Sequence, residues 1–105
     1  MKKWEYLELR KLSSSSEGKN VLQIWPAYKL NSENLKQYLA GYSSTRVGSN
    51  TKDNYLIVFL GENDWGHVTH ALRDYLGSLG WEAYSAIGNE DVTIYFKRIY
   101  RGKKH

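Results

Sequence analysis

The sequence predicts an α+β fold: an antiparallel sheet of about four to five strands, packed by one main helix over residues about 65–79. A short helix candidate lies at about 33–40. Segments rich in aromatic and β-branched residues with alternating polarity indicate the strands, and one segment has apolar residues at helical spacing. The length of 105 residues suits a single domain, residues 1–105.

The first third of the chain predicts a β-hairpin. Residues 3–12 alternate charged with aromatic or aliphatic side chains, which is typical of a strand. Residues 21–28, VLQIWPAY, predict a second strand that ends near Pro26, because proline cannot donate to a strand ladder. Between them, residues 13–20, SSSSEGKN, have the composition of a loop, so we expect a long connection.

A short helix is indicated by NSENLKQYLAGY. Ser32 is suited to cap its first turn, and Gly41 is suited to end it. Three apolar residues would share one face of this helix: Leu35, Tyr38 and Leu39.

The middle of the chain joins a polar segment to an apolar one. Residues 43–54 are rich in serine, glycine and asparagine, and we expect them to be the least structured segment. Residues 55–60, YLIVFL, are all apolar, which predicts a strand covered on both faces.

The main helix is expected to begin after Asn63 or Asp64, either of which can cap it. Its apolar residues repeat at a period of 3.6 and predict one buried stripe: Trp65, Val68, Leu72, Tyr75, Leu76 and Leu79.

The segment LGSLGWEAYSAIG predicts how the main helix ends. With Leu79 as the C-cap, Gly80 would take the left-handed conformation, and Trp81 would pack back on Leu76. Strands are expected to follow at 81–87 and 92–100, joined by the turn GNED. Leu76, Gly80 and Trp81 are therefore interpreted as a structural corner.

Three short motifs resemble a small bacterial family known as domain of unknown function number 4177: Lys2–Tyr6, Leu76–Glu82 and Tyr95–Arg98. The resemblance implies a small α+β domain with one helix against an antiparallel sheet, and it implies no activity. The segment at about 13–54 is longer than the usual connection in that family, so it would be an atypical insertion. The remaining feature is a basic C-terminal tail, residues 101–105.

Composition limits the function classes. The chain has no cysteine, which excludes disulfides, thiolate metal sites and a cysteine nucleophile. No apolar run reaches membrane-spanning length, so a cytoplasmic protein without membrane contact is expected. The charge is uneven: five basic residues and no acid follow Phe96, whereas residues 61–92 hold six acids and one base.

Two sets of side chains suggest metal or acid–base chemistry. His67, His70 and Asp74 would share a helix face opposite the buried stripe, and such a set can bind zinc or nickel; a solvated helix surface is the alternative. Four acids lie at predicted turns, where helix capping is the alternative to catalysis: Glu62, Asp64, Glu90 and Asp91.

A third set suggests binding of an anionic ligand. Basic side chains that alternate with aromatic ones resemble the pattern of single-strand nucleic-acid binders, although a charged strand end gives the same pattern. The candidate residues are Arg46, Lys52, Lys97, Arg98, Tyr100 and Arg101.

The surplus of large aromatic residues indicates an interaction function. Four tryptophans and nine tyrosines are too many for one small core, and exposed Trp and Tyr often mark interfaces. We therefore expect a non-enzymatic binding module that forms homo-oligomers and needs no cofactor. The first alternative is a nucleic-acid or nucleotide binder, and the second is a metal-dependent enzyme that uses the His/Asp helix face.

Overall fold

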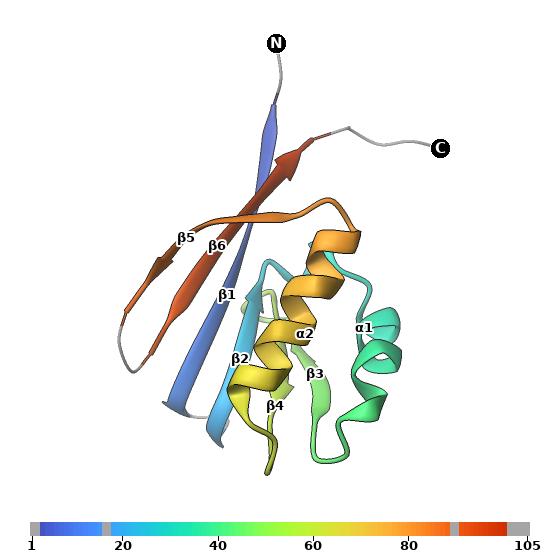
Figure 1. Ribbon diagram of the computed structural model, residues 1–105, viewed down its shortest axis with the longest axis vertical. Coiled ribbons are helices and arrows are strands. Elements are labelled where there is room, and N and C mark those ends of the chain that lie inside the picture. Colours follow the sequence, from blue (N-terminus) through green and yellow to red (C-terminus); the bar gives the residue numbers. More distant parts are fainter. Residues whose placement is uncertain (1–2, 16–17, 89–90, 101–105) are drawn as a thin grey trace.

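Six strands form one antiparallel sheet in the computed structural model, which describes residues 3–15, 18–88 and 91–100 (Figure 1). The α+β class is confirmed, although four to five strands was too few. The strands lie in the order β3-β4-β2-β1-β6-β5. Their bounds are β1 Trp4–Ser15, β2 Gly18–Trp25, β3 Arg46–Asn50, β4 Tyr55–Phe59, β5 Glu82–Ile87 and β6 Thr93–Ile99.

The predicted hairpin is confirmed, but its long loop is wrong. β1 and β2 pair from Glu8↔Trp25 to Ser15↔Gly18, so only residues 16 and 17, outside the described residues, separate the strands. The ladder continues through Ser14 and Ser15, which pair with Lys19 and Gly18 beyond the ends of the neighbouring strands β6 and β4. β2 ends at Trp25, directly before Pro26, as predicted.

Strand β3 is the element that the sequence did not predict. Arg46–Asn50 pairs along the whole of β4, in the segment expected to be least structured. Val47 is its single large apolar residue, and an ideal Cβ on Gly48 would meet Ile57 Cγ2 at 3.4 Å. The strand therefore depends on its partner rather than on its own composition.

Strand β4 lies next to β3 and is buried on both faces, as its apolar sequence predicted. Leu56 and Val58 face the helices, while Tyr55 and Ile57 face the other way, and all four are buried. The segment 13–54, expected as an insertion, contributes β2, α1 and β3 to the same structure.

Two helices cover one face of the sheet: α1 (Ser32–Tyr38) and α2 (Trp65–Ser78) (Figure 1). Two short 3₁₀ helices, Ala27–Lys29 and Leu39–Gly41, flank α1. The shared core contains side chains from both layers, among them Leu7, Leu9, Leu22, Ile24, Leu35, Val58, Leu72, Leu76, Trp81, Ile94 and Phe96. No helix in the described ranges is long and apolar enough to cross a membrane.

The helix termini correct two predictions in detail. α1 is capped by Asn31, whose side chain accepts a hydrogen bond from the Asn34 amide at 3.0 Å, so the cap lies one residue before Ser32. α2 is capped by Asp64 as predicted, through the Gly66 amide at 3.0 Å. Leu79, expected in the buried stripe, is 41% exposed because the helix ends before it.

The corner after α2 has the geometry that LGSLGW predicts. Gly80 has φ +92°, its amide donates to the Gly77 carbonyl, and the Trp81 amide donates to the Leu76 carbonyl, both at 3.0 Å. This pair of hydrogen bonds is the Schellman motif. Leu76 and Trp81 are both buried in the core, so the corner fixes the direction in which β5 leaves the helix.

Gly80→Ala should lower the free energy of unfolding by about 1 kcal/mol, and the melting temperature by roughly 4 °C, because an L side chain is strained at positive φ. The strain is conformational, since an ideal Cβ would meet nothing closer than Arg98 Cδ at 4.0 Å. Gly77→Ala is the matched control: its Cβ would meet nothing within 4 Å, and it should be neutral or stabilising. Equal melting temperatures for the two variants would contradict the capping argument.

The other face of the sheet, here called the open face, has a second, smaller core at β2 and β4. Val21, Tyr55 and Ile57 are buried there, with Leu12, Trp25 and Phe59 packed around them. Arginine side chains extend this cover, since the Arg10 guanidinium lies 4.8 Å from the Trp25 ring centroid. The β1–β6–β5 part of the same face is much more exposed.

Candidate functional site: the open face of β1, β6 and β5

Four aromatic rings and one lysine form a cluster on the open face of β1, β6 and β5. Strand alternation places them there: Tyr6 pairs with Lys97, and Trp4 pairs with Ile99. A bulge between Ala83 and Ser85 adds Tyr84 from β5 to the same surface. We call this surface the aromatic patch and define it as Trp4, Tyr6, Tyr84, Tyr95 and Lys97.

Lys97 lies at the centre of the aromatic patch. Its Nζ atom is 4.5 Å from the Trp4 ring centroid and 5.5 Å from that of Tyr84, which is cation–π distance. The Tyr84 ring contacts the rings of Tyr6 and Tyr95, with centroids 6.3 and 6.2 Å apart. These contacts hold the side chains in place while much of their surface stays open to solvent.

The aromatic patch belongs to a larger exposed apolar surface on the open face. Nine large hydrophobic side chains are exposed among the described residues, and five of them lie on this face of β1, β6 and β5: Trp4, Tyr6, Tyr84, Ile87 and Ile99. The composition indicated that some Trp and Tyr must be exposed, but not which. The alternation of Trp4 and Tyr6 along one strand was the available signal.

The structure separates the residues predicted to bind an anion. Lys97 lies in the aromatic patch, whereas Arg46 stacks on Phe59 at the other edge of the sheet, 5.0 Å from its ring centroid. Lys52 is exposed in the turn between β3 and β4. Tyr100 is 45% exposed and its amide donates to the Lys3 carbonyl, while Arg101 lies outside the described residues.

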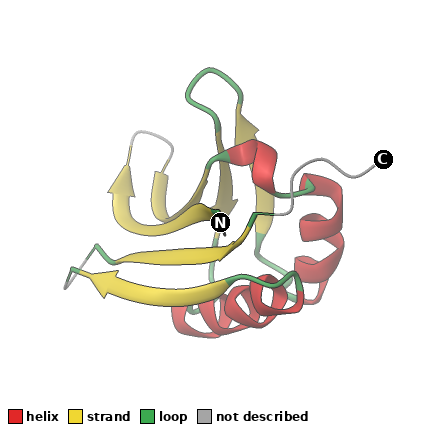
Figure 2. Ribbon diagram, turned by 90° about the horizontal axis from the view of Figure 1, so that it is seen from above, coloured by secondary structure: helices red, strands yellow, loops and turns green. Residues whose placement is uncertain are grey.

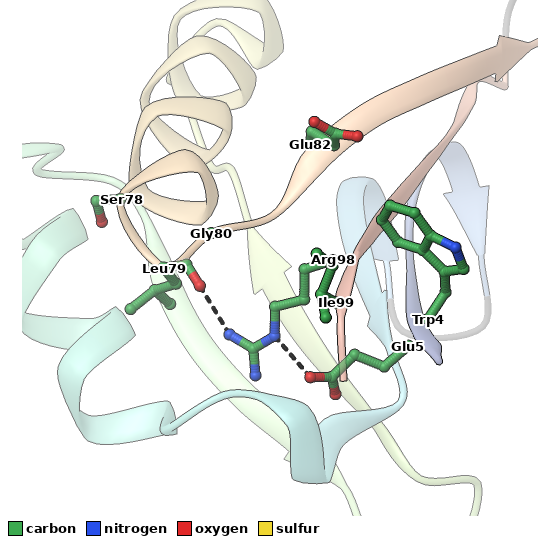
Figure 3. A pocket seen from close by; sticks show the side chains of 8 residues that line it. All are labelled: Trp4, Glu5, Ser78, Leu79, Gly80, Glu82, Arg98 and Ile99. Atoms are coloured by element: carbon green, nitrogen blue, oxygen red, sulfur yellow. Dashed lines mark hydrogen bonds and ion pairs between the residues drawn. The ribbon is translucent and has the colours of Figure 1, made fainter. Parts of the chain in front are cut away.

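Arg98 faces the helices, away from Lys97, and has structural partners. Its Nε donates to the Glu5 carboxylate and its Nη1 to the Leu79 carbonyl, both at 2.8 Å (Figure 3). The guanidinium also lies 4.3 Å from the Trp81 ring centroid. Its prediction as an anion-binding residue is therefore not supported by its position: it ties β6 to the end of α2.

Glu5 is the centre of this ion network. Its carboxylate accepts hydrogen bonds from Arg98 and, at 2.8 Å, from Lys29 Nζ, and it is 11% exposed. Burial raises the pKa of Glu5, but the hydrogen bonds from Lys29 and Arg98 outweigh it and hold the pKa below its usual value. The network borders a pocket of about 600 Å³ between Trp4, Glu82 and the end of α2 (Figure 3).

The predicted metal residues do not form a ligand set. His67, His70 and Asp74 all border a groove of about 620 Å³ between α2 and Tyr38 and Tyr42. Within the part of the chain that the structure describes, no group of three His, Cys, Asp or Glu side chains is close enough together to hold a metal ion. The Nδ1 atom of His67 instead lies 3.7 Å from the capping carboxylate of Asp64.

The acids at the turns have structural roles where they have partners. Asp64 caps α2. Asp91 accepts hydrogen bonds from the Ser13 amide at 3.0 Å and the Ser13 hydroxyl at 2.9 Å, which lower the pKa of Asp91. Glu62 is exposed, and Glu90 lies outside the described residues.

No family model, curated protein or solved structure matches this chain. The resemblance to family number 4177 therefore stays a prediction that rests on three short motifs, and the function is inferred from the surface described above.

Proposed function

We propose that this chain is a non-catalytic interaction module that self-associates through the β5 side of its sheet. The observation that carries the proposal is the concentration of exposed apolar side chains there: five of the nine exposed large hydrophobic residues lie on the open face of three adjoining strands. Exposed aromatic and aliphatic side chains that gather on one surface often mark contact sites.

The chemistry of this surface also suits contact more than catalysis. Tyrosine and tryptophan supply large contact areas with few rotatable bonds and a polar tip. Lys97, the basic group in the patch, is held between Trp4 and Tyr84. Among the acids considered for acid–base work, Asp64 and Asp91 already serve a helix cap and a strand–turn contact.

Light scattering at micromolar concentration should give a mass of at least twice the 12.2 kDa of the monomer. The physical reason is that association removes the exposed Tyr84 and Ile87 from water, at about 25 cal/mol for each Å² of apolar surface. A monomer mass across the accessible concentration range would contradict the proposal.

A single-stranded nucleic-acid binder is the second candidate, and one arrangement favours it. Aromatic rings beside a lysine can stack bases and hold a phosphate, and Lys97 lies among four rings in the aromatic patch. Glu82 lies on the same face, where its carboxylate opposes a polyanion. We rank this candidate second for that reason.

Fluorescence anisotropy with single-stranded DNA and RNA distinguishes this candidate. If the aromatic patch binds nucleic acid, Lys97→Ser should weaken binding. The slope of the logarithm of the binding constant against the logarithm of the salt concentration should become shallower by about 1, for one lost phosphate contact. Arg46→Ser, at the opposite edge of the open face, is the matched control and should leave both unchanged. Absence of binding even in low salt would remove nucleic acid as a ligand.

A further inference from the structure

Strand β5 lies at the edge of the sheet, and among the described residues no strand pairs with its outer edge, while side chains on both of its faces are exposed. Tyr84 and Ile87 face the open side and are 50% and 60% exposed. Ala83 and Ala86 oppose Phe96 and Ile94 on the helix side and are also exposed. Ala83 borders a pocket beside α2, whereas the far end of β5 extends beyond the helical layer (Figures 1 and 2). Four of the six residues of β5 are therefore apolar and open to water.

The opposite edge of the sheet is different. α1 lies beside β3 in Figure 1, and Val47 of β3 packs against the main core. β3 also carries Arg46 and Gly48 in place of exposed large apolar side chains. Natural edge strands are blocked from pairing by charge, proline, cover or a bulge. Of these devices β5 has one charge, Glu82 at its first position, and the bulge at Tyr84.

We infer that β5 pairs antiparallel with β5 of a second copy of this chain, around a two-fold axis at the regular stretch Ser85–Ile87. This inference rests on the proposed self-association and specifies its geometry. The bulge ends at Ser85, so three residues with regular pairing to β6 remain on the C-terminal side. Their outward backbone groups form the template for another strand.

The symmetry of an antiparallel pairing favours a second copy as the partner of β5. An antiparallel pairing about Ala86 places Ser85 of each copy opposite Ile87 of the other, with a small side chain at the axis. It also keeps the two Glu82 carboxylates at opposite ends of the paired strands, where they do not repel each other. The result is one continuous sheet in which the exposed Tyr84 and Ile87 of both copies meet.

A single introduced thiol tests this geometry, because the chain has no cysteine of its own. Facing residues at the axis of an antiparallel pair have Cβ atoms about 4.5–5.5 Å apart, near the distance that a disulfide spans. Ala86→Cys should therefore form a disulfide-linked dimer under mild oxidation. The rate should be on the order of tenfold or more above that of Ser49→Cys, an exposed position on β3, because pairing raises the effective concentration of the thiols.

Hydrogen exchange of the unmodified chain gives the second readout. Amides of residues 82–87 should exchange more slowly as the protein concentration rises through the association range. Association without this protection, and with equal cross-linking of the two cysteine variants, would overturn edge pairing while leaving self-association in place. A face-to-face dimer would give that result, since Ala86 points away from the open face. A monomer at all concentrations would overturn the proposed function itself.

Discussion

Trp81→Ala should lower the free energy of unfolding by about 3 to 5 kcal/mol, the range for removing a large aromatic side chain from a core. Trp81 is 3% exposed and belongs to the main core. It also closes the Schellman corner through its amide and supports the Arg98 guanidinium through its ring. Its loss leaves a cavity where α2, β5 and β6 meet. Urea unfolding followed by circular dichroism measures the change.

Trp81→Phe is the matched variant for this prediction. The indole Nε1 atom is buried and has no hydrogen-bond partner within the described ranges, so losing its N–H sacrifices no observed bond. Phenylalanine keeps much of the apolar volume and a ring under Arg98. We expect Trp81→Phe to lower the free energy of unfolding by less than half as much as Trp81→Ala does. Equal destabilisation by both would show that ring packing is not what Trp81 supplies.

Glu5→Ala should be the second most damaging change, at about 3 kcal/mol, because it leaves two largely buried cations without their shared carboxylate. Lys29 and Arg98 side chains are 17% and 30% exposed, so neither is fully solvated when the partner is removed. The partial exposure of Arg98 places the expected cost at the lower end of the range for buried pairs. Thermal unfolding at pH 7 measures it, and a loss below 1 kcal/mol would contradict the role of Glu5.

The pH dependence of the same group has a definite sign. The folded-state pKa of Glu5 lies below its ordinary value of 4.5, so the native state favours the charged form. The stability that Glu5 contributes is therefore present above about pH 4.5 and is lost as the pH falls through the folded-state pKa. The stability difference between the natural chain and Glu5→Gln should shrink on going from pH 7 to pH 3. A stability difference that stays the same from pH 7 to pH 3 would show that the charge of Glu5 does not contribute to the free energy of unfolding.

The sequence predicted correctly those elements whose own residues contain a cap, an apolar repeat or an apolar run. α2 has a capping aspartate, a 3.6-residue apolar repeat and a glycine at its end, and all three have their expected roles. β4 is apolar at every position, and the structure buries it on both faces. β3 and the serine-rich end of β1 have no such pattern. These two segments are strands because they pair with neighbouring strands, and this pairing cannot be predicted from their composition alone.

The candidate site was predictable in kind but not in position. The number of Trp and Tyr residues indicated exposed aromatic surface, yet which of them share a face depends on the register of β1, β5 and β6. The bulge that adds Tyr84 has no evident sequence signal. Lys97 and Arg98 are adjacent in sequence and were both predicted to bind an anion. Strand alternation places Lys97 in the aromatic patch and Arg98 on the opposite face, beside Glu5.

Sedimentation equilibrium of two matched variants tests most directly whether the β5 side is the contact region. Ile87→Ser and Tyr28→Ser each replace one exposed large hydrophobic side chain, 60% and 74% exposed, by serine. Ile87 lies at the proposed contact, whereas Tyr28 lies in the short helix Ala27–Lys29 after β2. We predict that Ile87→Ser weakens dimerisation at least about tenfold, the effect of losing roughly 1.4 kcal/mol of apolar burial per dimer, and that Tyr28→Ser leaves it unchanged. Equal dissociation constants for the two variants would contradict self-association through the β5 side.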